Sequence, residues 1–84
     1  MVGGMVIGVR RLEDRIWANC MDGPDECAIY VERNADSEQL KIGDSLWWQG
    51  SWAMWTPNPD DGRHDVQIPR IGYSGVSDPR GGAA

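Results

Sequence analysis

The chain has 84 residues, of which 40% are hydrophobic and 25% charged, and its formal net charge is −5. This length allows a single domain, and the composition is typical of a folded globular protein rather than of a disordered chain. Phenylalanine is absent and tryptophan occurs five times, so the core must be built from Trp, Ile, Val, Leu and Met. We expect one small domain over residues 1–73 and a flexible C-terminal tail over residues 74–84.

The negative charge is concentrated in one part of the sequence. Residues 22–44 contain seven acidic side chains but only two basic ones, Arg33 and Lys41. The arginines elsewhere are scattered and form no basic stripe that would neutralise a phosphate backbone, so we do not expect nucleic acid as a partner. No stretch approaches the roughly 18 apolar residues of a membrane span, and the N-terminus lacks a signal-peptide pattern. We therefore expect a cytoplasmic protein without membrane contact.

Three short segments in the first half of the chain alternate between apolar and other residues, as half-buried strands do. These segments are residues 5–10, 15–21 and 26–33. In the first, Met5, Ile7 and Val9 should face one side. Short polar loops connect the segments, which predicts an antiparallel meander.

The segment LWWQGSWAMW, residues 46–55, contains four of the five tryptophans. Gly50 can take the positive φ that the first central position of a type II′ turn requires, so a two-residue loop should join two strands here. Side chains alternate across a strand, which gives this hairpin one face for the core and one for the surface. The expected core face consists of Leu46, Trp48, Ala53 and Trp55, and the expected surface face consists of Trp47, Gln49, Trp52 and Met54.

The remaining segments complete an all-β protein. Residues 34–39 are polar and too short for a sustained helical period, so we expect a loop with room for no more than a short helical turn. Gly43 and Asp44 should form a turn before the hairpin. Residues 66–71 form a last strand, in which Pro69 cannot donate a hydrogen bond and so marks an edge or a bulge. Five or six short strands predict a small, partly open antiparallel β-barrel of the SH3-like or OB-like type.

The surface face of the hairpin is the candidate contact surface. If Trp47 and Trp52 are exposed, the apolar area of their two rings approaches ~300–600 Å². This is the size of the largest apolar patch on a typical monomer, and a patch of this size often marks a binding site. A second internal packing layer and an error in the strand register are the alternatives. Trp17 and Tyr30 lie opposite the small apolar side chains of their strands and could extend the surface. The candidate binding residues are Trp47, Trp52, Met54, Gln49, Trp17 and Tyr30.

Other kinds of site have little support. Cys20 and Cys27 bracket a six-residue loop and could form a cross-strand disulfide, but in the cytoplasm a pair of buried thiols is favoured. With the single histidine, His64, they are too few for structural zinc. The acidic loops around Asp22 and Asp60 lack the spacing of a calcium-binding loop. No nucleophile elbow or Gly-rich phosphate loop occurs, and we expect no metal, cofactor or catalytic site.

The stretches IGDSLWWQGSWAMWTP and DVQIPRIGYSGV, within residues 42–76, resemble short uncharacterised proteins encoded in phages and proteobacterial prophages. The resemblance implies a small accessory or assembly protein and no known activity. The residues themselves predict a non-enzymatic module that binds a protein partner or a second copy of itself through the aromatic face. The alternative is a ligand-binding module on which a sugar, a proline-rich peptide or single-stranded nucleic acid stacks.

Overall fold

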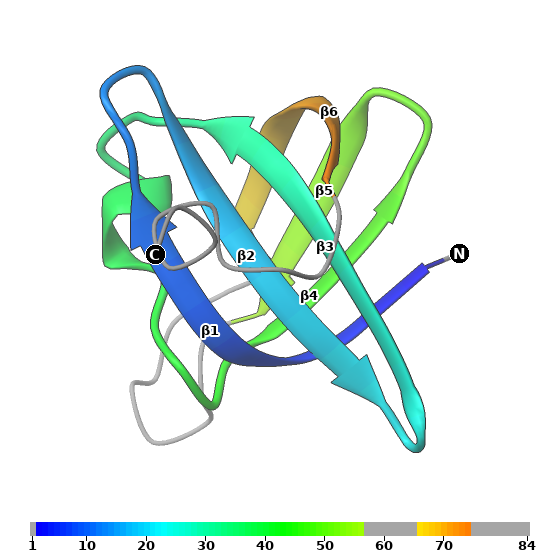
Figure 1. The fold of residues 1–84 in the computed structure, drawn as a ribbon. Coiled ribbons are helices and arrows are strands. Elements are labelled where there is room, and N and C mark those ends of the chain that lie inside the picture. Colours follow the sequence, from blue (N-terminus) through cyan, green and yellow to red (C-terminus); the bar gives the residue numbers. More distant parts are fainter. Residues whose placement is uncertain (1, 57–65, 75–84) are drawn as a thin grey trace.

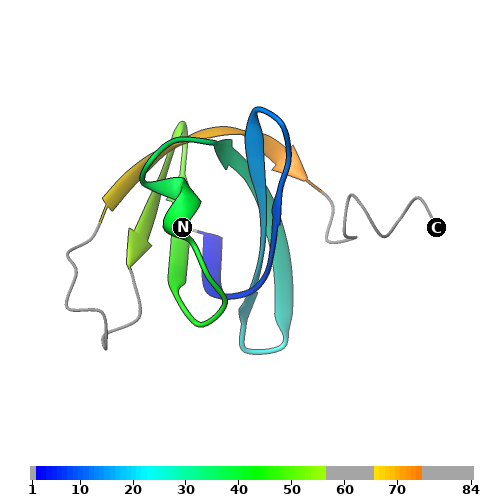
Figure 2. The ribbon, with the colours of Figure 1, turned by 90° about the vertical axis from the view of Figure 1, so that its left-hand side faces the viewer.

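The structure, a computed structural model, describes residues 2–56 and 66–74. Within these residues, six antiparallel strands form one sheet that closes into a barrel (Figure 1), and one 3-10 turn, η1, lies between β3 and β4 in the chain (Figure 2). The elements are β1 (Val2–Arg11), β2 (Arg15–Asp22), β3 (Asp25–Glu32), η1 (Ser37–Gln39), β4 (Ser45–Gln49), β5 (Trp52–Thr56) and β6 (Val66–Ser74). The predicted all-β class is confirmed.

The barrel consists of two three-stranded meanders, β1–β2–β3 and β4–β5–β6. Pairing of β3 with β6 joins them on one side, and pairing of β1 with β4 closes the ring on the other. The predicted antiparallel barrel is therefore present, but the ring is closed rather than partly open. The reason is that β1 begins at Val2, whereas the sequence predicted a strand only from Met5. The assignment to an SH3-like or OB-like type stays a prediction.

The closure of the ring depends on two glycines in β1. The strand pairs with β4 through its first residues and with β2 from Met5 onward. At the change of partner, Gly3 and Gly4 have φ values of +144° and +151°. A Cβ atom would lie 2.1 Å from the Leu46 carbonyl oxygen at Gly3 and 2.2 Å from the Met21 carbonyl oxygen at Gly4. A side chain at either position would thus push β1 away from one of its two neighbours.

A bulge changes which residues of β1 face the core. The register with β2 shifts between Val6 and Gly8, so Ile7 is the additional residue. Val6 is fully buried, whereas Met5 is 53% exposed. The prediction that Met5, Ile7 and Val9 share one face is therefore wrong, because the extra residue shifts the alternation by one position.

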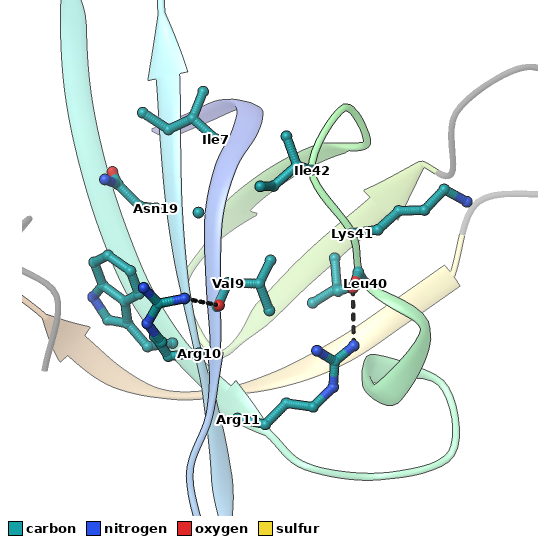
Figure 3. Close-up of a pocket in the computed structure, with 10 residues that line it drawn as sticks. Ile7, Val9, Arg10, Arg11, Asn19, Leu40, Lys41 and Ile42 are labelled. Atoms are coloured by element: carbon teal, nitrogen blue, oxygen red, sulfur yellow. Dashed lines mark hydrogen bonds between the residues drawn. The ribbon is translucent and has the colours of Figure 1, made fainter. Parts of the chain in front are cut away.

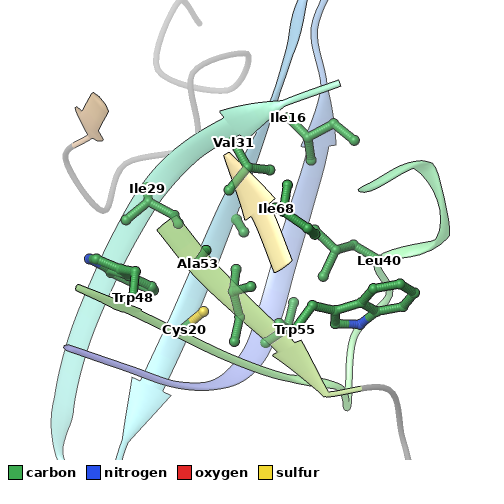
Figure 4. Packing of buried hydrophobic residues seen from close by; sticks show 12 residues of the cluster. Ile16, Cys20, Ile29, Val31, Leu40, Trp48, Ala53, Trp55 and Ile68 are labelled. Atoms are coloured by element: carbon green, nitrogen blue, oxygen red, sulfur yellow. The ribbon is translucent and has the colours of Figure 1, made fainter. Parts of the chain in front are cut away.

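The core fills the interior of the barrel with apolar side chains from every strand (Figure 4). The hairpin of β4 and β5 has the predicted register, from Leu46 opposite Trp55 to Gln49 opposite Trp52. Gly50 has the expected positive φ, +63°. All four residues of the predicted core face belong to the buried cluster, which comprises Val6, Ile16, Ala18, Cys20, Ile29, Val31, Leu40, Leu46, Trp48, Ala53, Trp55 and Ile68.

Asp44 connects the turn before β4 to this core. The carboxylate is fully buried, and its Oδ2 accepts hydrogen bonds from the indole nitrogen of Trp55 at 2.9 Å and from the backbone nitrogen of Lys41 at 3.2 Å. The second bond closes the predicted turn, in which Gly43 has a φ of +102°. Because a buried carboxylate is tolerated only when it is hydrogen-bonded, this arrangement fixes the turn against the Trp55 ring.

The last strand changes partner in its middle. Residues 66–69 of β6 pair with β5, and the residues from Arg70 to Ser74 pair with β3. The register with β3 shifts at this point, which leaves Ile71 bulged outward and 42% exposed. Pro69 therefore lies just before the bulge, in a part of β6 that pairs only with β5 among the described strands, in agreement with the predicted edge or bulge. The strand continues to Ser74, where the sequence predicted the start of a tail, and residues 75–84 lie outside the described part of the chain.

We predict that Gly4→Ala lowers the free energy of unfolding by about 3 kcal/mol or more, because alanine is strained at this φ and its Cβ would overlap the Met21 carbonyl oxygen. Gly8→Ala is the matched control in the same strand, since its Cβ would make ordinary contacts at 3.5 Å. Urea unfolding followed by tryptophan fluorescence measures both variants. Equal stability of the two would show that closure of the ring does not need a glycine at position 4.

Candidate functional site

The outer face of the β4–β5 hairpin carries a shallow groove of about 170 Å³, which we call the hairpin groove. The strand register builds it from two rows of side chains that cross the sheet. One row is Trp47, Met54 and Gln67, and the next is Gln49, Trp52 and Pro69. The rows are two positions apart along each strand, which corresponds to a distance of about 7 Å. Trp48 and Ala53, which lie between the rows, also line the groove.

The two faces of the hairpin differ sharply in exposure. Trp52 is 50% exposed, whereas Trp48 and Trp55 are 2% and 1% exposed. Trp47 and Met54 are half-buried. The burial therefore follows the predicted alternation, and the aromatic side chains of the outer face meet around the groove.

The groove offers hydrogen-bonding groups but no charge. None of its lining residues within the described part of the chain is charged. Gln49 and Gln67 are exposed carboxamides, one in each row. The indole N–H groups of Trp47 and Trp52 are further donors, whereas the indole nitrogen of Trp48 is buried on the core side of the hairpin and is not open to a ligand in the groove. The lining is thus suited to a neutral ligand that presents apolar surface and hydrogen-bond acceptors.

Trp17 and Tyr30 lie beside each other but away from the hairpin groove. They pair across β2 and β3, and the Arg15 guanidinium lies 5.5 Å from the centroid of the Tyr30 ring. Because β6 separates β3 from β5 in the ring, neither residue lines the groove. Trp17 is also only 3% exposed. Of the candidate binding residues, the structure brings together Trp47, Gln49, Trp52 and Met54 and leaves Trp17 and Tyr30 out.

The structure adds Gln67 to the lining of the groove and places Pro69 next to Trp52 in the same row. Alternation in the last strand places both on the face opposite the buried Ile68. That pattern alone does not tell which strand lies beside β5, so neither residue was predicted as part of the surface. The assumption that β6 pairs with β5, its neighbour in the sequence, would have placed both residues beside the hairpin.

A second, larger groove of about 730 Å³ follows β1 (Figure 3). Arg10, Arg11 and Lys41 line it together with apolar side chains. Arg11 is engaged in the fold, since its Nη2 donates to the backbone oxygens of Glu38 and Leu40 at 2.6 and 3.1 Å, and its Nε donates to the Glu38 carboxylate at 3.1 Å. Arg11, one of the three cationic side chains that line this groove, therefore connects η1 to the end of β1.

The two cysteines lie directly opposite each other on β2 and β3, and both are thiols in the structure. The Sγ of Cys27 lies 3.7 Å from the carbonyl oxygen of Gly3 and 3.8 Å from that of Cys20. Burial raises the pKa of Cys20 to about 12, with a smaller contribution from Cys27. Burial is also the main cause that raises the pKa of Cys27. A reactive thiolate is therefore disfavoured at neutral pH.

No cluster of three or more His, Cys, Asp or Glu side chains forms a metal site within residues 2–56 and 66–74. His64 and the acidic residues Asp60, Asp61 and Asp65 lie outside that part. No helix in the described residues is long and apolar enough to cross a membrane.

Comparison with known proteins finds no matching family model, curated protein or solved structure. The resemblance to phage-encoded proteins therefore stays a prediction.

We predict that Trp48→Ala and Trp55→Ala each lower the free energy of unfolding by about 3–5 kcal/mol, because both rings are buried in the core. Trp52→Ala is the control on the same hairpin and should cost less than about 1 kcal/mol, because half of its ring surface is already in water. Thermal melts decide between these values. A loss below about 1 kcal/mol at both core positions would mean that the faces are assigned the wrong way round.

We predict that the buried thiol of Cys20 makes the protein less stable at alkaline pH. The unfolded thiol loses its proton near its ordinary pKa of 9.0, whereas the folded thiol keeps it until about 12, so the free energy of unfolding falls as pH rises through this range. Between about pH 7 and about pH 10.5, wild type should lose up to about 2 kcal/mol more than Cys20→Ala does. Urea titrations at both pH values measure the difference, and equal losses would show that the thiol titrates normally.

Proposed function

We propose that the protein is a non-enzymatic interaction module that binds a protein partner, or a second copy of itself, through the hairpin groove. The observation that carries the proposal is the position of Trp52, which is half exposed beside Trp47 and Met54 on a hairpin whose other face is fully packed. Tryptophan and methionine are enriched at protein interfaces, and aromatic anchors contribute much of the binding energy.

The barrel supports this role because it holds the rings in place before binding. β4 pairs with β1 and β5 pairs with β6, so both strands of the hairpin are internal to the sheet. Little backbone ordering is then needed on association, which lowers its entropic cost. The same pairing uses the backbone groups of both strands, so a partner would be recognised by side chains rather than by addition of a strand.

The chemistry of the lining supports binding rather than catalysis. The groove presents indole rings, a thioether and carboxamides, and none of these groups acts as an acid, a base or a nucleophile at neutral pH. An isologous dimer is the simplest form of the proposal, because one surface would cover the groove on both copies. Stacking of a sugar on the same rings is the second form, and phosphate-bearing ligands are disfavoured by the uncharged lining.

We predict that the double variant Trp47→Ser/Trp52→Ser stays folded but loses association. Each anchor is expected to contribute about 2 kcal/mol or more, so the combined effect on affinity should exceed about 100-fold. Circular dichroism reports the fold, and light scattering after size exclusion, together with a pull-down, reports self-association and partner capture. Unfolding of the variant would show that the rings belong to the core.

The matched control for this experiment is Met5→Ser/Met21→Ser. These two residues are neighbours across β1 and β2, and they are 53% and 38% exposed, so the control removes exposed apolar surface outside the groove. Association should be retained in this variant. Loss of association in both double variants would indicate nonspecific hydrophobic association rather than a defined site. Retention of association in both would contradict the proposal.

A further inference from the structure

We infer that the hairpin groove receives a proline-rich segment of the partner in the polyproline II conformation. This inference rests on the proposed function and names the chemistry of the segment that occupies the groove. Three observations carry it: the spacing of the two rows, the balance of hydrogen-bond donors and acceptors, and the absence of charge among the described lining residues.

The spacing of the rows suits a flat, saturated ring. Adjacent rows on one face of a sheet are about 7 Å apart, and apolar atoms pack best at about 3.5–4.0 Å. A pyrrolidine ring placed between the Trp47 row and the Trp52 row would therefore contact both. The groove, at about 170 Å³, is too small for the several side chains that an amphipathic helix inserts over two turns.

The hydrogen-bonding groups around the groove are mostly donors. Trp47 and Trp52 each carry an indole N–H, Gln49 and Gln67 each carry an amide NH₂ group, and the amide oxygens are the only side-chain acceptors in the lining. A polyproline II segment matches this balance, because its carbonyl groups make no internal hydrogen bonds and its prolines have no N–H.

A sugar matches the balance less well. Each hydroxyl group both donates and accepts, so a sugar in the groove would bring more donors than the two amide oxygens can take. Unpaired donors reduce affinity, because their hydration is lost without replacement. The groove therefore favours the peptide over the sugar, although both would stack on the same rings.

The test is a titration of the ¹⁵N-labelled full chain, observed through its tryptophan indole N–H signals and assigned with single Trp→Phe variants. The probes are a capped oligoproline peptide, a Gly-Ser peptide of the same length and a cello-oligosaccharide. With oligoproline, the signals of Trp47 and Trp52 should shift and saturate. The signals of Trp17, outside the groove, and Trp55, bonded to Asp44, should stay in place. The Gly-Ser peptide should cause no shift.

Variants connect the response to the groove. Gln49→Ala/Gln67→Ala should weaken oligoproline binding by about threefold to tenfold per lost hydrogen bond, with unchanged thermal melts because both side chains are exposed. Trp52→Ser should abolish saturation, and Met5→Ser/Met21→Ser should bind as wild type does. Unchanged affinity in the glutamine variant would overturn the assigned role of the donors.

Failure of this inference and failure of the proposed function are distinguishable. If Trp47→Ser/Trp52→Ser loses association while the wild-type protein does not bind oligoproline, the proposed function as an interaction module is retained and the polyproline assignment is overturned. Shifts caused by the cello-oligosaccharide alone would assign the groove to sugars and overturn the inference. Oligoproline shifts that persist in Trp52→Ser would place the peptide elsewhere and overturn it as well.

Discussion

Pairing of β1 with β4 is the contact on which the barrel depends. Without it, two meanders would be joined only through β3 and β6, and β1 and β4 would both be open edges. The pairing is possible because Gly3 and Gly4 allow β1 to bend where its backbone passes within side-chain distance of both neighbours. Closure makes β4 an internal strand, which fixes the backbone beneath Trp47. The rigidity of the candidate site is therefore a consequence of two residues that lie outside it.

A second constraint sets which way the hairpin faces. Asp44 holds the turn before β4 and at the same time pairs with the indole of Trp55 at the end of β5. A slip of the hairpin by one residue would turn Trp55 outward, remove this hydrogen bond and leave a buried carboxylate with fewer partners. The buried contact thereby stabilises the arrangement in which Trp52 points to solvent. The same hairpin register therefore both buries Trp55 and exposes Trp52.

The features that could be predicted from the sequence are local ones. The hairpin at Gly50, its two faces and the turn at Asp44 each follow from residues within a few positions of one another. The features that could not be predicted depend on strands that meet across the barrel. The bulge at Ile7, the change of partner in β6 and the closure at β1 leave no periodic signal. Trp17 illustrates the difference: alternation correctly placed it on an outer face, but the outer faces of a barrel point in different directions, and only the order of strands tells which residues share one.

The acidic segment also has a different meaning in the structure than in the sequence. Glu38 forms ion pairs with Arg11 and Arg33. The hydrogen bond from Arg33 is the main cause that lowers the pKa of the Glu38 carboxyl group. Asp44 is buried in the core, and Glu26 accepts a hydrogen bond from Asn19. Several acids of residues 22–44 therefore hold η1, the turn and the strands together. The hairpin groove, by contrast, contains no charge among its described residues, so recognition there must come from the shape of its rings and the direction of its hydrogen bonds. The polyproline II segment that we propose as its ligand is rigid, neutral and rich in acceptors, so it would match both properties.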